Sequence, residues 1–398
     1  MKLQRNLFFN IVIILTLCAI GLHFYLTQKY YALQFGSLTE SSACNVSSLL
    51  NCDVTSASRY SSLWGYPMAL WGLVTNTLFL FFALISRFQL ASDTEQSDRW
   101  TLIGAGFIAG VSLVMGLISV TMVKSICIFC FATYLISFFN FGVLFSLVDS
   151  KTLWSENLRL LFSSEKWVLG MGAAVPVCVL LLSSFFTGQL GLGDTKMNIL
   201  VAEKIQSWKN SPVTEFNNEK GLIIGASENP QMTIVEFADF MCPHCKHAAP
   251  TLEAFTLSRP GVRLIFKPFP LDGTCNPDPA LKGYGDGSRC FLASIVMCEE
   301  KLNKQGWKAH HFIFENQEKI REWGSNEQVA NQWCSYSHSD CQNLNSCISS
   351  EEIRKEIAEL SEEGIKAQVQ GTPAIFVNGR SLQGGQLIPV LEKALESL

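Results

Sequence analysis

The sequence predicts a membrane-embedded helical bundle followed by a soluble α/β domain. Two observations predict this division. From Met1 to about Leu190 the 398-residue chain is dominated by long apolar runs, whereas the rest has the mixed composition of a soluble domain. In that second part, segments with strand and helix patterns follow one another. A chain of this length is long enough for two domains.

Five apolar segments are each long enough to cross a membrane, which takes about 20 residues. None of them contains Asp, Glu, Lys or Arg. They run over Leu7–Gln28, Trp64–Ser86, Trp100–Val123, Cys127–Val148 and Trp167–Leu190. The first segment is long, has no clear small-residue cleavage site and is followed by four more. We therefore expect a retained helix rather than a signal peptide.

Lys and Arg are distributed unequally between the loops that join these segments. With Met1 on the cytoplasmic side, seven Lys and Arg residues lie in cytoplasmic segments and three in the outer loops. Positive residues favour the cytoplasmic side. We therefore predict a multi-pass membrane protein with a cytoplasmic N-terminus. Five spans would place the C-terminal domain outside the cytoplasm. The net charge of −4 gives no indication of a nucleic-acid partner.

Fourteen cysteines are many for a cytosolic protein and indicate an oxidising compartment. Cys18 and Cys178 lie inside apolar runs, and we expect both to be small buried hydrophobes. The predicted topology places three other groups on the outer face: Cys44 with Cys52, Cys127 with Cys130, and the cysteines of the soluble tail. It therefore predicts a thiol relay on the outer surface of the membrane.

Cys127 and Cys130 form a CxxC motif at the start of the fourth apolar segment. Thiols three residues apart at a helix start share a face and can form a small disulfide, and the helix N-terminus favours the reactive thiolate. The alternative is a pair of packing cysteines or half of a zinc site, although such a site needs two more close ligands. Cys44 and Cys52 lie in a polar loop, where they would either exchange disulfides or form a structural staple.

Several short motifs extend along the first 150 residues. They are Cys44, Cys52-Asp53-Val54, Ser58-Arg59-Tyr60, Gly65-Tyr66-Pro67, Leu70-Trp71-Gly72 and Cys127-Ile128-Phe129-Cys130. Together they resemble the vitamin K epoxide reductase (VKOR) family in its bacterial form, over about Leu7 to Val148. The resemblance implies a location in the bacterial inner (plasma) membrane and a four-helix core, with the fifth apolar segment as a linking helix.

The same resemblance implies a role for each of these cysteines. The loop pair would collect electrons, and the membrane pair would hand them to a quinone, either ubiquinone or menaquinone. Cys44 would meet the partner thiol, and Cys52 would attack Cys127. Cys130, one turn deeper in the helix, would then face the quinone.

The family also has a polar side chain near the quinone, shortly after the second loop cysteine. Ser58 and Ser62 are both candidates for this position. Either residue would otherwise be an ordinary loop or helix-cap serine.

The soluble part contains a strand, a CxxC motif and a helix in succession. The pattern predicts a strand at Met232–Phe240, the motif Cys242-Pro243-His244-Cys245, a helix at Ala248–Leu257, a strand at Val262–Pro268, a helix at Glu351–Gln370, a strand at Ala374–Asn378 after Thr372-Pro373, and a last helix ending near Ser397. This order resembles the DsbA branch of the thioredoxin fold, with a helical insertion, over about Gly221 to Leu398. The resemblance implies that Pro373 is cis and lies against the active disulfide.

The predicted position of Cys242 at a helix N-terminus has a chemical consequence. Backbone N–H groups and the helix dipole stabilise its thiolate, and His244 can add a hydrogen bond or partial positive charge. A stabilised thiolate makes the disulfide a strong oxidant. Cys242 would be the reacting sulfur and Cys245 the resolving one. The resemblance further implies that Glu236 is a buried acid that assists proton transfer; the alternative is a surface carboxylate on an edge strand.

Six further cysteines are expected to form structural bridges, because free thiols beside an oxidant would be a liability. They are Cys275, Cys290, Cys298, Cys334, Cys341 and Cys347. Fifteen pairings are possible, and we favour Cys275 with Cys290 or Cys298. A zinc site is the rival, suggested by His310-His311, but adjacent histidines point in different directions and no metal is expected.

The predicted organisation has three parts: a VKOR-like quinone-reducing domain at 1–150, a fifth membrane helix and linker at 151–220, and a DsbA-like domain at 221–398. The hypothesis is a quinone-linked thiol oxidoreductase that makes disulfide bonds in secreted or periplasmic proteins. Electrons would pass from the substrate through the CPHC pair, the loop pair and the membrane pair, the two domains acting as intramolecular partners. The alternatives are a disulfide reductase or isomerase, and a membrane-tethered metal- or thiol-binding module.

Overall fold

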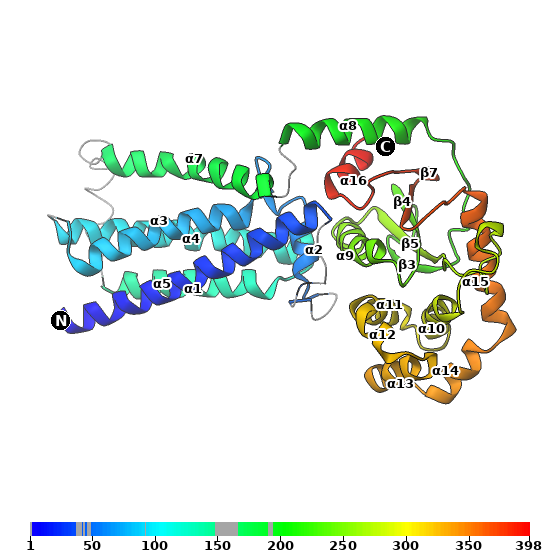
Figure 1. Cartoon of the computed structure of the whole chain (residues 1–398). Coiled ribbons are helices and arrows are strands. Elements are labelled where there is room, and N and C mark those ends of the chain that lie inside the picture. Colours follow the sequence, from blue (N-terminus) through cyan, green and yellow to red (C-terminus); the bar gives the residue numbers. More distant parts are fainter. Residues whose placement is uncertain are drawn as a thin grey trace. The chain divides into compact units, whose positions relative to one another are not determined.

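The computed structural model (Figure 1) describes residues 2–36, 42, 44–45, 49–91, 93–147, 166–189 and 194–398. The chain divides into two compact units. The first comprises Met1–Ala32 and Ser42–Asp194, and the second comprises Leu33–Ser41 and Thr195–Leu398. The predicted cytoplasmic loop between the fourth and fifth apolar segments lies outside the described residues.

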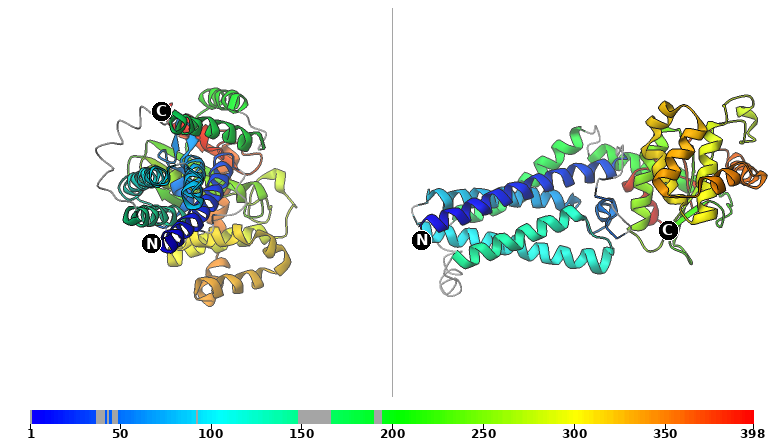
Figure 2. Two further views of the ribbon diagram at one scale, coloured as in Figure 1. Left: turned by 90° about the vertical axis from the view of Figure 1, so that its left-hand side faces the viewer. Right: turned by 90° about the horizontal axis from the view of Figure 1, so that it is seen from below.

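The first unit is built from long apolar helices that run alongside one another (Figures 1 and 2). Its elements are α1 (Lys2–Gln34), α2 (Cys52–Ala57), β1 (Ser62–Leu63), β2 (Tyr66–Pro67), α3 (Met68–Phe88), α4 (Thr94–Ile118), the π-helical turn η1 (Ser119–Val123), α5 (Ile128–Leu147) and α7 (Lys166–Gln189). Apolar side chains of α1, α3, α4 and α5 form a common core. The several long apolar helices confirm the predicted helical bundle.

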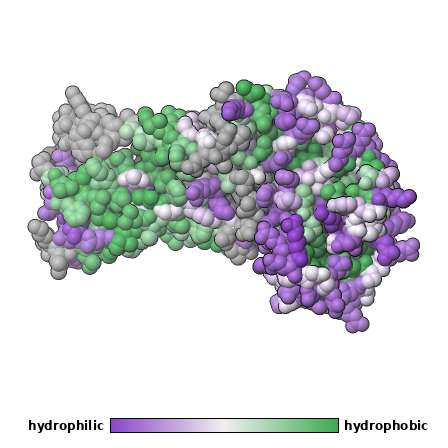
Figure 3. All heavy atoms as spheres, viewed as in Figure 1, coloured by the Kyte–Doolittle hydropathy of each residue, from purple (hydrophilic) through white to green (hydrophobic). Residues whose placement is uncertain are grey.

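Polar side chains join the helices inside this bundle, while large apolar ones face outward. Asn140 of α5 donates to Thr16 of α1 at 3.2 Å, and Ser86 of α3 contacts Thr101 of α4 at 2.9 Å. Such interhelical hydrogen bonds are typical of membrane helices. The drawn face of the unit is largely hydrophobic (Figure 3). A large exposed apolar surface of this kind fits a lipid environment.

Among the residues that the structure describes, four helices are long and apolar enough to cross a membrane. These spans are Gln4–Gln34, Met68–Phe88, Thr94–Val123 and Ile128–Leu147. The helix α7 packs on α3. Among the described residues its apolar part is Ala174–Gly188, which is shorter than the four spans. The fifth span therefore stays a prediction.

The expectation that Cys18 and Cys178 are buried was wrong. Both side chains are exposed, on α1 and α7 respectively. The physical reason is that the outward face of a membrane helix is covered by lipid rather than by protein. A position inside an apolar run therefore does not imply burial within the chain.

The second unit is built on a five-stranded mixed sheet of order β3-β5-β4-β6-β7. The strands are β3 (Leu222–Gly225), β4 (Met232–Ala238), β5 (Val262–Pro268), β6 (Ala374–Val377) and β7 (Arg380–Ser381). β4 and β5 are parallel, and the other pairs are antiparallel. β4 and β5 lie inside the sheet and are mostly buried, which is why each appears in the sequence as an almost continuous apolar run.

Helices surround this sheet, and most of them lie in one insertion between β5 and β6. The helices are α8 (Asp194–Asn210), α9 (Pro243–Leu257), the short 3₁₀ turn η3 (Pro279–Leu281), α10 (Ser288–Asn303), α11 (Gly306–Glu315), α12 (Gln317–Trp323), α13 (Asn326–Ser337), α14 (Cys341–Ile348), α15 (Glu351–Lys366) and α16 (Ile388–Leu395). The run from α10 to α15 is the predicted helical insertion. Trp208 of α8 donates to the Val377 carbonyl at 3.1 Å, so part of the segment predicted as a linker is a helix of this unit.

Three disulfides tie the insertion together. They join Cys275 to Cys290, Cys298 to Cys347, and Cys334 to Cys341. The prediction that all six cysteines form bridges is confirmed, and Cys275 pairs with one of the two partners favoured from the sequence.

Candidate redox sites

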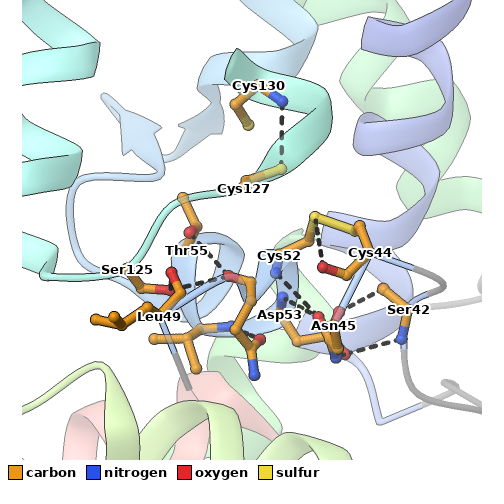
Figure 4. The surroundings of a disulfide bond; sticks show 12 residues. Ser42, Cys44, Asn45, Leu49, Cys52, Asp53, Thr55, Ser125, Cys127 and Cys130 are labelled. Carbon is orange, nitrogen blue, oxygen red and sulfur yellow. Dashed lines mark hydrogen bonds between the residues drawn. A yellow bond between two sulfur atoms is a disulfide. The ribbon is translucent and has the colours of Figure 1, made fainter. Parts of the chain in front are cut away.

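The first site gathers four cysteines where α2 meets the start of α5 (Figure 4). Cys44 and Cys52 form a disulfide, with their Cα atoms 5.8 Å apart. The sulfur atoms of Cys44, Cys52 and Cys127 all lie within 4.8 Å of one another. The Cys130 backbone N–H donates to the Cys127 sulfur at 3.3 Å. The structure thus brings the loop pair and the membrane pair together.

Backbone pairing holds the loop disulfide beside Cys127. The Asn51 N–H donates to the Ile126 carbonyl at 3.1 Å, and the Ile126 N–H donates to the Leu49 carbonyl at 2.7 Å. Asn51 also caps α2, since its side chain accepts from the Val54 N–H at 2.9 Å. These bonds fix the register between the residue before Cys52 and the residue before Cys127.

Buried Asp53 organises the other side of the loop. Its carboxylate accepts from the Ser42 hydroxyl at 2.5 Å and from the Asn45 side-chain amide at 2.6 Å. The Asn45 oxygen in turn accepts from the Cys52 N–H at 2.9 Å. Hydrogen bonds to a buried carboxylate are among the stronger ones in proteins, so Asp53 anchors both ends of the segment that carries the disulfide.

A cavity of about 230 Å³ lies among the membrane helices next to this site. Cys130 and Ser58 are among its lining residues, together with apolar side chains of α1, α3 and α4. Ser62, the other predicted serine, lies on β1 and is not among the described residues that line the cavity. An apolar cavity with a few polar groups is typical of a small-molecule site.

The cavity wall also contains polar residues that were not predicted from the sequence, among them His23, Asn76 and Tyr134. An ionisable residue inside a membrane span is a functional candidate, and this holds for histidine as well as for Asp, Glu, Lys and Arg. His23 would have met that criterion. It packs directly on Gly72, because a Cβ atom there would lie 2.3 Å from the His23 ring.

The second site is the CPHC motif at the start of α9. Cys242 is the N-cap residue and is 9% exposed, whereas Cys245 is fully buried. The Cys242 thiol donates to the Thr372 carbonyl at 3.3 Å. The Thr372–Pro373 bond is cis, as the resemblance implied, and it lies beside Cys242.

The two thiols of this motif have opposite electrostatic environments. Hydrogen bonding from Cys245 is the largest influence on Cys242 and outweighs burial. Together with the Thr372 side chain and backbone N–H groups, it lowers the pKa of Cys242 to about 5. Burial, followed by the proximity of Cys242, raises the pKa of Cys245 well above its usual range. Cys242 is therefore the thiolate at neutral pH and Cys245 the protonated partner.

The side chains of Glu236 and His244 differ in burial: Glu236 is buried and His244 is exposed. Glu236 is only 1% exposed on the central strand β4, so it is not an edge-strand surface carboxylate. Burial, then the charges of Glu253 and Cys242, raise its pKa to about 8. The His244 side chain is exposed, and its contribution to the Cys242 thiolate is its backbone N–H.

Two further residues support the motif: Gln317 comes from the helical insertion, and Asp239 lies directly before the motif. The Gln317 amide donates to the Phe240 carbonyl at 2.8 Å and to the Cys242 carbonyl at 3.0 Å. Buried Asp239 accepts from the Met241 N–H at 2.7 Å. No local pattern marks Gln317, because it reaches the motif only through the packing of the helical insertion.

Comparison with known proteins assigns both parts of the chain. Residues 10–145 match the Vitamin K epoxide reductase family, and residues 233–396 match the DSBA-like thioredoxin domain. The chain joins a domain of each family. The VKOR and DsbA-like domains together point to a thiol–disulfide oxidoreductase, and the second unit is a DsbA-like thioredoxin fold.

Individual relatives cover only part of this VKOR–DsbA chain. It is 26% identical over 181 residues to the probable disulfide bond formation protein D of Bacillus anthracis. This match covers 43% of this chain and 75% of that protein. It is 25% identical over 175 residues to the Na(+)/H(+) antiporter NhaA 3 of Salinispora tropica, but this match covers only 24% of that antiporter.

Two solved structures also match part of this chain. Oxidised BdbD from Bacillus subtilis is 18% identical, with a TM-score of 0.39, over 47% of this chain and 97% of that one. DsbA2 of Pseudomonas aeruginosa is 21% identical, with a TM-score of 0.34, over 45% of this chain and 99% of that one.

Proposed function

We propose that this protein makes disulfide bonds in proteins outside the cytoplasm and passes the electrons to a membrane quinone. The net reaction would convert a substrate dithiol and a quinone into a substrate disulfide and a quinol. Two electrons and two protons leave the dithiol and are taken up by the quinone, so the reaction balances without a further reactant.

The observation that carries this proposal is the row of sulfur atoms in the first unit. The Cys44–Cys52 disulfide lies within 4.8 Å of Cys127, and Cys130 follows one helical turn later on the cavity wall. Electrons that enter at the loop therefore have an unbroken path of thiol–disulfide exchange to the cavity.

Each step follows from attack of a thiolate on a disulfide. A substrate thiolate attacks Cys242, and the second substrate thiol resolves the mixed disulfide. The Cys242 thiolate then attacks Cys44, and Cys245 releases it. Cys52, freed as a thiolate, re-forms its disulfide through exchange with Cys127 and Cys130. The exchange between the two units would be helped by their covalent link, which raises the effective concentration of one for the other.

The residues around the cavity fit a quinone. The wall is largely apolar, as an isoprenoid quinone requires, and Ser58, His23, Asn76 and Tyr134 supply groups able to donate hydrogen bonds to its oxygens. When bound, a quinone accepts two electrons and two protons. Cys130 is the redox cysteine that lines this cavity, and it would deliver the electrons.

The environment of Cys242 favours oxidation of substrates over reduction. Its lowered pKa means that the reduced form is stabilised, which makes the corresponding disulfide a stronger oxidant. This argues against the reductase and isomerase alternative. For the same reason the second unit belongs outside the cytoplasm, where the excess of Lys and Arg in the predicted cytoplasmic loops would also place it.

The decisive experiment counts quinone molecules reduced by a known number of thiols. The purified full chain is reduced mildly without oxygen, freed of reductant and mixed with a soluble ubiquinone analogue. Three pairs would be reduced: Cys44 with Cys52, Cys127 with Cys130, and Cys242 with Cys245. Each releases two electrons, so wild type should reduce three quinones per chain. Mass spectrometry of alkylated thiols verifies that the three structural bridges stayed intact.

Two variants make this count specific. Cys242→Ala combined with Cys245→Ala should reduce two quinones per chain, because one pair is missing. Cys130→Ser should reduce none. Quinone reduction that persists in Cys130→Ser contradicts the proposed order, and a wild type that leaves the quinone oxidised contradicts the quinone itself.

A further inference from the structure

A cluster of ionisable side chains lies beside Glu236 in the second unit. Glu253 is on α9, the helix that begins at the CPHC motif, and His310 and His311 are consecutive residues of α11. His311 Nε2 lies 2.5 Å from Glu253 Oε2, and His310 Nδ1 lies 3.5 Å from Glu253 Oε1. The histidines do point differently, one inward and one outward, yet a single carboxyl group contacts both.

These side chains extend from the interior to the surface. Glu236 and His310 are 1% exposed, the Glu253 side chain is 13% exposed, and the His311 side chain is 49% exposed. The His310 ring packs edge-on against Phe266 at 4.6 Å, and Phe266 pairs with Glu236 across β4 and β5. His310 therefore covers the part of the sheet that carries Glu236.

Buried atoms of this cluster lack partners. Glu236 Oε1 and both ring nitrogens of His310 have no hydrogen-bond partner among the described residues. Unpartnered buried polar groups are rare and call for an explanation such as a catalytic role. Burial, then the charge of His311, lowers the pKa of His310 well below its usual range, so its ring is neutral. A neutral imidazole accepts a proton at one nitrogen and donates one from the other.

The outer groups are suited to exchange protons with solvent. Burial lowers the pKa of His311, but the charge and hydrogen bond of Glu253, with a smaller effect of Glu315, outweigh it and raise the pKa overall. The charge of Glu253 also raises the pKa of Glu236, after the larger effect of burial. Glu253 is thus close enough to influence both the innermost and the outermost group.

The chemistry of the CPHC pair needs a proton path. When a substrate thiolate attacks Cys242, the Cys242–Cys245 bond breaks and Cys245 leaves with the electron pair. Because burial raises the pKa of Cys245, its sulfur takes a proton, and Glu236 holds one at neutral pH. Before the disulfide can form again, Cys245 must give that proton up. In each cycle one proton therefore enters the buried surroundings of Cys245 and one leaves them.

We propose that Glu253, His310 and His311 form the proton route between buried Glu236 and solvent. Glu236 exchanges the proton with Cys245, His310 and Glu253 carry it through the interior, and His311 exchanges it with water. The inference rests on the proposed redox role of the Cys242–Cys245 pair and extends it to residues that touch neither sulfur.

The test separates the two half-reactions of the CPHC pair in the full chain. Cys44→Ala and Cys52→Ala in every sample prevent exchange with the first unit, and no quinone is present. The disulfide is first reduced by a dithiol peptide, and the reduced protein is then oxidised by oxidised glutathione. Acid quenching, alkylation and mass spectrometry give the rate of each half-reaction.

His311→Gln and Glu253→Gln are compared with Glu362→Gln, an exposed carboxyl of α15 that serves as the control. Reduction by the peptide should keep the wild-type rate in all three, because Glu236 already holds its proton; this also shows that the variants are folded. Reoxidation should be slower by about ten-fold or more in His311→Gln and Glu253→Gln only. Added imidazole should restore the rate of His311→Gln.

Several results would overturn the relay. They are an unchanged reoxidation rate in His311→Gln, an equal loss in both half-reactions, and no recovery with imidazole. A wild-type rate that changes with added Zn²⁺ or a chelator would also overturn it, because the cluster would then bind metal. A wild-type pair that undergoes neither half-reaction refutes the proposed function instead, which distinguishes the two failures.

Discussion

Cys242 and Cys245 are three residues apart, yet one end of a helix gives them opposite proton affinities. The first lies at the N-terminus, where the Cys245 thiol, Thr372 and backbone N–H groups stabilise a thiolate. The second lies one turn inside, with no exposed surface. Position along a single helical turn therefore divides the roles of attacking and resolving sulfur.

This difference predicts a pH dependence for the stability of the reduced form. The pKa of Cys242 is about 5 in the folded state and about 8.5 for an ordinary thiol. A depressed pKa contributes stability that is complete above the unfolded pKa and is lost as pH falls towards 5. We expect the melting temperature of the reduced protein, minus that of the oxidised protein, to rise between pH 5 and 8.5.

Melting curves of both forms in detergent, followed by circular dichroism, test this expectation. Glu236 also titrates in this range, but burial and Glu253, the main causes of its raised pKa, are present in both forms and largely cancel in the difference. A difference that is flat with pH would show that the Cys242 thiolate is not stabilised by the fold.

Lys267 predicts a second effect at the scale of one residue. Its side chain is fully buried, donates to the Asn217 carbonyl at 2.7 Å and forms an ion pair with Glu363 at 2.8 Å. Removing one partner of a buried pair strands the other charge, at a cost of about 3–5 kcal/mol. We expect Glu363→Ala to lower the free energy of unfolding of the second unit by about this amount.

The matched control for this prediction is Glu359→Ala. Glu359 pairs with Lys220 at 2.6 Å, but both side chains are about 40% exposed, so solvent screening should make the loss far smaller. Denaturant titration of the second unit measures both variants. Equal losses in the two variants would mean that burial of the Lys267 pair does not matter to stability.

Among the elements, the close approach of α1 and α3 predicts a specific sensitivity. A Cβ atom at Gly72 would lie 2.3 Å from the His23 ring, which lines the cavity next to Cys130. Small residues at helix interfaces allow such approaches in membranes. We expect Gly72→Ala to push His23 from its place and to slow quinone reduction by about ten-fold or more.

Gly110→Ala on α4 and Gly142→Ala on α5 are the controls, since a Cβ atom at either position has nothing within 4 Å. Both variants should reduce the quinone analogue at the wild-type rate in the same anaerobic assay. If all three glycine variants behave alike, the contact between His23 and Gly72 has no part in the cavity's function.

The elements also show what the sequence can and cannot predict. The first residues of β4 and β5 were predicted correctly, because the sequences of buried central strands are nearly continuous apolar runs. The first apolar segment was predicted too short, since α1 continues through Arg5, which pairs with Asp98 of α4 at 2.7 Å. The ion pair joins residues far apart in the chain, and no local pattern reveals it.

The same distinction applies to the candidate sites. The cysteine pairs and Pro373 were found from the sequence because their spacing and neighbours carry the chemistry. Gln317 and Glu253 were missed, since each acquires its meaning only from a residue that the fold brings to it. The sequence likewise could not distinguish Ser58 from Ser62. The structure does so, because Ser58 lines the cavity and Ser62 is not among the described residues that do.

For the whole molecule, membrane topology links the two units. The four spans that the described residues support would return the chain to the side on which it began. A fifth crossing by α7 would instead place the second unit on the side opposite Met1. Whether the number of membrane crossings is odd or even therefore decides whether the DsbA-like unit and the loop disulfide lie on the same side of the membrane.

An odd number of membrane crossings predicts that the two chain ends differ in accessibility in intact spheroplasts. A peptide tag after Leu398 should be removed by external protease, whereas a tag before Met1 should be protected until the membrane is permeabilised. The positive-inside bias gives the N-terminal orientation, and the odd number of crossings gives the C-terminal one. Protection of both tags would mean that α7 does not cross the membrane. In that case Cys242 would lie in a reducing compartment, and a chain of disulfide exchange from secreted substrates to Cys130 would be impossible.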